Sequence, residues 1–140
     1  MRSRACLFVA AWLLFLAACS HLPERALIPV PPVTLSGGWQ RVTLDTPAAG
    51  EAPPVLRALK PSQRVRASYR GASITIGVDA YALPSQASAF EAQQQWRKEE
   101  GTLGFQSGNL FVVLSSQGAA QDRLIAFSRT LEEEWLGGRR

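Results

Sequence analysis

An apolar run near the start of the chain stops at a cysteine and divides the sequence into two parts. Cys6 to Ala18 form an unbroken apolar run of 13 residues behind the basic side chains of Arg2 and Arg4. As a helix, such a run covers about 20 Å, whereas the hydrocarbon core of a bilayer is about 30 Å thick. The run is therefore short for a membrane span and is typical of the helix of a signal peptide.

The apolar run ends in Leu16-Ala17-Ala18-Cys19, which resembles the lipobox of bacterial lipoproteins. The resemblance implies cleavage before Cys19, a diacylglyceryl thioether on its sulfur, and acylation of the new amino terminus. A thiol is a strong nucleophile, and two or three acyl chains anchor a protein stably where one does not. The alternatives are an ordinary secretory signal or an uncleaved anchor. With Ser20 after the cysteine, the chain resembles the lipoproteins that a Gram-negative host sorts to the outer membrane, where they face the periplasm.

The sequence therefore predicts three segments: a signal peptide over residues 1–18, a lipid-anchored proline-rich tether over 19–36, and one domain over 37–138. The prolines of the tether predict extended, polyproline II-like backbone. No cysteine follows Cys19, so we expect the domain to be held by its core without disulfides. His21 is the only histidine, and we therefore expect neither a metal site nor a cofactor. The mature chain carries a charge of about +2, which argues against a nucleic-acid partner.

The hydropathy pattern after Gly38 predicts a single α+β domain. Period-two patterns and turn residues predict strands, periodic apolar stripes between caps predict helices, and the short connections predict hairpins. We therefore expect a largely antiparallel sheet of about five strands, with two main helices packed on one face. The strands are expected at 39–44, 64–70, 74–81, 103–106 and 110–115, and the helices at 54–60, 85–100 and 120–136.

Three stretches indicate how these elements pack. Residues 110–114 are continuously apolar, which favours a central strand covered on both faces. In the last helix, a stripe at spacings of three and four predicts a buried face formed by Leu124, Phe127, Leu131 and Trp135. In the preceding helix, Ala89, Phe90, Gln93 and Trp96 are expected to share a stripe.

From Trp39 onward, the order of elements is similar to uncharacterised families of bacterial envelope α+β domains. The residues that carry this resemblance are Tyr69-Arg70-Gly71, the strand to Tyr81, Ala89-Phe90 and Gly108-Asn109-Leu110-Phe111. The resemblance supports the fold and implies no activity.

Five basic residues follow one another without an acidic residue between Ala52 and Val78. They are Arg57, Lys60, Arg64, Arg66 and Arg70. The last three share one strand face, where guanidinium groups are suited to an anionic glycan, anionic lipid or acidic envelope protein. The alternative is a solvated face, or an edge strand charged against aggregation. Asp79 is expected to pair with an arginine across the hairpin.

No pattern in the sequence predicts a catalytic site. No serine lies in a Gly-x-Ser-x-Gly motif, and the acidic runs 99–100 and 132–134 are adjacent helical residues that point to different faces. We therefore expect a lipid-anchored, periplasm-facing lipoprotein that acts as a non-enzymatic accessory or interaction module. The alternative is a small-ligand or lipid carrier with an aromatic-lined cavity between sheet and helices. Such a cavity would be lined by Trp39, Trp96, Trp135, Phe90, Phe105, Phe111 and Phe127.

Overall fold

A computed structural model describes residues 27–137 as one α+β domain. Its strands are β1 (Thr34–Leu35), β2 (Trp39–Asp45), β3 (Gln63–Gly71), β4 (Ile74–Ala82), β5 (Thr102–Ser107) and β6 (Leu110–Ser115). Its helices are α1 (Pro54–Ala58), α2 (Gln86–Gln95) and α3 (Gln121–Leu131), with a 3₁₀ turn at Ala49–Glu51 and a π-helical turn at Glu132–Leu136. The predicted signal peptide, the predicted lipid-attachment residue Cys19, and Ser20 lie outside the described residues. Within 27–137, no helix is long and apolar enough to cross a bilayer.

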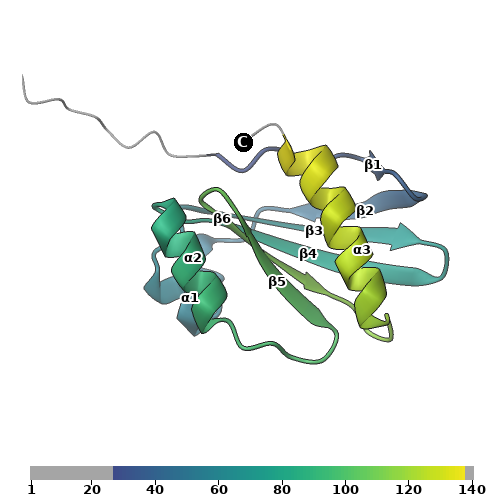
Figure 1. The fold of residues 1–140 in the computed structure, drawn as a ribbon. Coiled ribbons are helices and arrows are strands. Elements are labelled where there is room, and N and C mark those ends of the chain that lie inside the picture. The colour runs from purple at the N-terminus through teal and green to yellow at the C-terminus, as the bar shows by residue number, and fades with distance from the viewer. Residues whose placement is uncertain (1–26, 138–140) are drawn as a thin grey trace, which may run out of the picture.

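The strands form one antiparallel sheet in the order β1-β2-β3-β4-β6-β5 (Figure 1). The predicted α+β class and antiparallel sheet are confirmed, and each of the five expected strands is present. The sixth strand, β1, has only two residues and was not predicted. The hairpin of β3 and β4 pairs continuously from Gln63 opposite Ala82 to Gly71 opposite Ile74.

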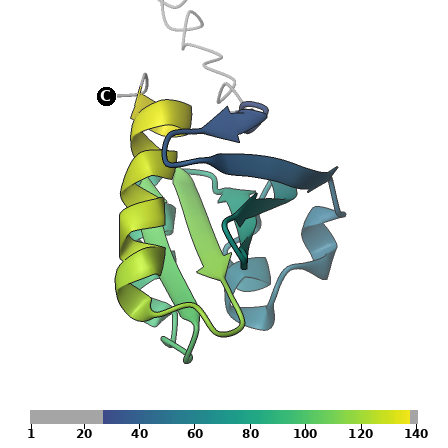
Figure 2. The same cartoon turned by 90° about the vertical axis from the view of Figure 1, so that its right-hand side faces the viewer.

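The two main helices lie on opposite faces of the sheet, so their predicted placement on one face is wrong. Alternate residues of β6 point to different cores: Leu110, Val112 and Leu114 belong to the core under α3, and Phe111 and Val113 to the core under α1 and α2. Figure 2 shows α3 and α1 on either side of the sheet. A strand that is apolar at every position requires cover on both faces. The predicted central position of this strand is confirmed.

The predicted stripe of α3 is confirmed, because Leu124, Phe127 and Leu131 are buried, and Trp135 in the π-helical turn is buried with them. Phe127 packs between two rings of the sheet. Its ring centroid lies 4.8 Å from that of Trp39 and 5.6 Å from that of Tyr69. The stripe thus joins α3 to β2 and β3.

The prediction for α2 is right at its beginning and wrong at its end. Ser85 caps the helix as expected, since its hydroxyl oxygen accepts a hydrogen bond from the Ser88 amide at 3.1 Å. The helix ends at Gln95 instead of Glu100, because Trp96 turns into an extended conformation and packs on Phe111, with ring centroids 5.8 Å apart. The buried face of α2 is formed by Ala89 and Ala92, whereas Phe90 is 55% exposed.

The last part of the expected tether belongs to the folded domain. Ile28 and Leu35 are buried in the core under α3, and β1 pairs with β2. The Tyr69 hydroxyl donates to the carbonyl of Pro32 at 2.7 Å, and the Trp135 indole donates to that of Pro29 at 3.0 Å. Residues 27–36 therefore lie against the domain, which begins before the predicted boundary at residue 37.

Candidate interaction surface

One face of the sheet is covered by helices at one end only. Residues that lie opposite each other in an antiparallel sheet point to the same face. On this face, α1 and α2 cover Tyr81, Phe111 and Leu83. The register places a set of polar residues on the uncovered part of the same face, and we call this set the open polar face. It consists of Gln40, Thr43, Asp45, Arg66, Ser68, Arg70, Thr75 and Ser115. All of them are exposed except Ser68, which is half-buried.

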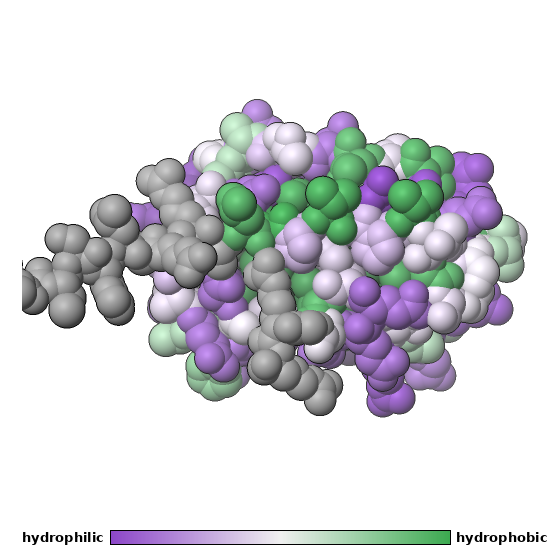
Figure 3. All heavy atoms as spheres, turned by 90° about the horizontal axis from the view of Figure 1, so that it is seen from above, coloured by the Kyte–Doolittle hydropathy of each residue, from purple (hydrophilic) through white to green (hydrophobic). Residues whose placement is uncertain are grey.

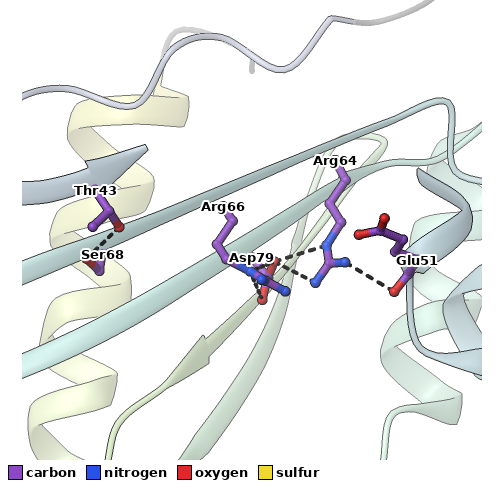
Figure 4. A network of polar contacts seen from close by, with 6 residues as sticks. All are labelled: Thr43, Glu51, Arg64, Arg66, Ser68 and Asp79. Atoms are coloured by element: carbon purple, nitrogen blue, oxygen red, sulfur yellow. Dashed lines mark hydrogen bonds and ion pairs between the residues drawn. The ribbon is translucent and has the colours of Figure 1, made fainter. Parts of the chain in front are cut away.

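A charged network marks the border between the covered and open parts (Figure 4). Asp79 accepts hydrogen bonds from two arginines of β3, because both Arg64 Nε and Arg66 Nε lie 3.1 Å from its Oδ1. The Nη2 of Arg64 lies 3.0 Å from the same oxygen. The predicted pairing of Asp79 with an arginine across the hairpin is therefore confirmed.

Arg64 is buried, which its strand pattern did not predict. It is only 5% exposed, its Nη1 donates to the Glu51 carbonyl at 3.2 Å, and its guanidinium lies 5.2 Å from the centre of the Tyr81 ring. The 3₁₀ turn at Ala49–Glu51 thus caps a guanidinium whose remaining partners are Asp79 and an aromatic face. Such a group is not available as an exposed contact for a partner, and removing it would leave the Asp79 carboxylate and the Glu51 carbonyl without these hydrogen bonds.

The other predicted contact residues are exposed, but they come from different elements. Arg66, which is 49% exposed, and Arg70 lie on the open polar face. Arg57 lies on α1 and Lys60 in the turn after it, where its φ of 55° is in the left-handed region. The structure therefore reduces the predicted row of three strand arginines to the pair Arg66 and Arg70.

Hydroxyl groups extend the open polar face beyond these arginines. Thr43 and Ser68 hydrogen-bond each other through their hydroxyl oxygens at 2.7 Å across β2 and β3. At the other border, a surface hollow of about 620 Å³ is lined by hydroxyl side chains of Ser73, Thr75, Thr102, Ser115 and Ser116, together with Ile74, Glu100, Gly101 and Gln117. Sequence reasoning missed these hydroxyl groups, although serine and threonine at outward strand positions were a signal for them.

The aromatic side chains proposed for a ligand cavity mostly fill the two cores. Trp39 packs on Phe127 and Trp96 on Phe111, while Phe90 is exposed. A hollow of about 460 Å³ next to Trp96 lies at the surface and is lined by Pro53, Val55, Gln95, Arg97 and Glu99. Burial raises the pKa of both Tyr69 and Tyr81 to about 12, and the charge of Asp79 contributes to the rise at Tyr81. Neither tyrosine is suited to proton transfer near neutral pH.

Among residues 27–137, no three His, Cys, Asp or Glu side chains are grouped as metal ligands would be. The chain matches no protein-family model, no curated protein and no solved structure. Its function is therefore inferred from its own residues.

Proposed function

We propose that this protein is a lipid-anchored envelope lipoprotein, attached through Cys19 and facing the periplasm, that acts as a non-enzymatic accessory or interaction module. The observation that carries the proposal is Leu16-Ala17-Ala18-Cys19 at the end of a 13-residue apolar run. The position of the domain supports it, because Ile28, the first buried residue in the described range 27–137, comes only nine residues after Cys19. A signal peptide, a short spacer and a compact domain follow one another in the order that such a protein requires.

The open polar face is the surface that we assign to the partner of this module. Arg66 and Arg70 present guanidinium groups, which bind carboxylates and phosphates with two parallel hydrogen bonds. Thr43, Ser68 and Thr75 add hydroxyl groups beside them. This combination is suited to a partner that carries anionic groups among hydroxyl or amide groups.

The anchor is tested with Cys19→Ser in the full chain. A hydroxyl group does not accept the diacylglyceryl group, so we expect the variant to lose incorporation of a clickable palmitate analogue and to remain unprocessed or become soluble. Labelling and fractionation after salt and carbonate washes measure this. If Cys19→Ser is still labelled with palmitate and recovered in the membrane fraction like the wild type, the protein is not anchored through Cys19.

The face is tested with the double variant Arg66→Gln/Arg70→Gln. Each charged hydrogen bond contributes about 1.5–3 kcal/mol, so we expect binding to an anionic polysaccharide such as polygalacturonate to fall at least about tenfold. Wild-type binding should weaken as salt rises, because exposed charges are screened over about 8 Å at physiological ionic strength.

The matched control for the face is Arg123→Gln/Arg129→Gln, which removes two exposed positive charges from α3. This control should bind as the wild type does. Equal losses in both double variants would mean that only net charge matters and that the open polar face is not the contact surface.

A further inference from the structure

The N-terminal segment, residues 27–33, lies on the domain with a three-residue repeat in its burial. Ile28 is 5% exposed and Pro31 is buried, three residues later. Leu27, Val30 and Val33 are 70%, 72% and 62% exposed. A polyproline II helix has three residues per turn, so residues three apart share a face. The segment therefore turns one row of side chains into the core and a second row, Leu27, Val30 and Val33, outward. We call this second row the apolar row.

The backbone of this segment is fixed by side chains from distant parts of the chain. The Ile28 amide donates to Gln63 Oε1 at 2.8 Å, and the carbonyls of Pro29 and Pro32 accept from Trp135 and Tyr69. Arg41 donates two further hydrogen bonds to the segment. Its guanidinium donates to the Pro31 carbonyl, and its backbone amide donates to the Val33 carbonyl at 2.8 Å. Proline has no amide hydrogen, so the segment also presents fewer donors than ordinary extended backbone.

From this arrangement, and on the basis of the proposed anchor at Cys19, we propose that the apolar row is a membrane-contacting surface that lays the domain against the lipid bilayer. Leu27 is eight residues from Cys19, a distance that a fully extended chain spans with at most about 29 Å. The row thus begins within that distance of the proposed anchor. Figure 3 shows apolar residues gathered in a band on the face seen from above.

The hydrogen bonds of the segment favour lipid as the occupant. Moving a backbone carbonyl out of water is costly unless it has a partner, and the carbonyls of Pro29, Pro31, Pro32 and Val33 each accept a hydrogen bond within the domain. Transfer of the exposed aliphatic side chains from water into lipid is favourable in free energy. An anchored domain stays within reach of the bilayer, so even a weak apolar contact is occupied for much of the time.

The experiment uses the full lipidated chain reconstituted in phosphatidylethanolamine–phosphatidylglycerol vesicles that contain nitroxide-labelled lipid. No cysteine follows Cys19, so Val30→Cys can carry a polarity-sensitive dye at a single position. The matched control is Phe90→Cys, an exposed apolar residue on α2. We expect the dye at position 30 to shift to shorter wavelength and to be quenched by the lipid several-fold more than the dye at position 90. Because the contact is apolar, raising the salt concentration should not reverse the difference.

A second variant distinguishes quenching caused by the apolar row from quenching caused by the dye's own affinity for lipid. With the dye at Thr34→Cys, Leu27→Ser/Val30→Ser/Val33→Ser should reduce quenching to the level of position 90. Equal quenching at positions 30 and 90 in vesicle-bound protein overturns the membrane contact and leaves the anchor intact. Failure of the wild-type protein to float with vesicles overturns the anchor itself. If the dye at position 30 is blue-shifted but not quenched by lipid, and Val30→Cys crosslinks between copies, the apolar row contacts a second copy of the chain and not the membrane.

Discussion

Arg64 and Arg66 contact the same oxygen of Asp79, but their surroundings differ. The strand pattern correctly placed Arg64, Arg66 and Arg70 on one face, because the period of two is a local property of the backbone. It did not predict that a 3₁₀ turn and α1 cover only one end of that face, since this cover is set by the path of the chain between β2 and β3. As a result, the pattern predicted three equivalent guanidinium groups where the structure has one that is buried and two that are exposed.

The same substitution at the two arginines should therefore have different costs. Arg64→Gln removes hydrogen bonds to Asp79 and to the Glu51 carbonyl from a buried site, and should lower the free energy of unfolding by about 2–3 kcal/mol. Arg66→Gln removes a half-exposed ion pair and should cost less than about 1 kcal/mol. Urea unfolding of both variants at neutral pH measures the difference. Equal costs would show that the cover over Arg64 contributes nothing to its pairing.

At the scale of elements, the sequence predicted well those features that depend on residues close to one another in the chain. The strands of the β3–β4 hairpin and the stripe of α3 follow from local periodicity and appear as expected. The end of α2 does not, because Trp96 leaves the helix to pack on Phe111, which belongs to β6. The proline pattern of residues 29–32 predicted extended backbone. It did not predict docking, since the partners Gln63 and Trp135 lie 35 and 106 residues away from the groups they contact.

Because this segment is docked, substitutions at positions 28 and 30 should change the free energy of unfolding by different amounts. Ile28→Ala removes a side chain buried in the core and should lower the free energy of unfolding by about 2–5 kcal/mol. Val30→Ala removes an exposed side chain and should change it by no more than about 0.5 kcal/mol. The measurement is urea unfolding followed by tryptophan fluorescence, which Trp135 beside Pro29 makes sensitive to the segment. A tether that is free of the domain would give near-zero values for both variants.

At the scale of the whole molecule, the domain consists of two apolar cores separated by one sheet, and each core contains one of the two tyrosines. Tyr69 lies in the core under α3, and Tyr81 in the core under α1 and α2. The apolar run at 110–114 predicted a strand covered on both faces, but the sequence did not predict which helix covers which face, because a hydropathy pattern alone does not state which side of a sheet a helix will cover. The two tyrosines therefore report on the two cores separately.

Burial of both phenols predicts how the molecule unfolds in alkali. The pKa of each is about 12 in the folded protein and 10.0 without burial, so the folded state disfavours ionisation. Their contribution to stability should be complete below pH 10 and be lost as the pH rises from 10 towards about 12, since the unfolded chain then releases protons that the folded chain retains. We expect tyrosinate absorbance at 295 nm to stay low above pH 10 and to rise together with the loss of circular dichroism. Tyr69→Phe and Tyr81→Phe should each halve the amplitude and so assign it. A tyrosinate signal near pH 10 with native circular dichroism would show that the core containing that tyrosine admits water.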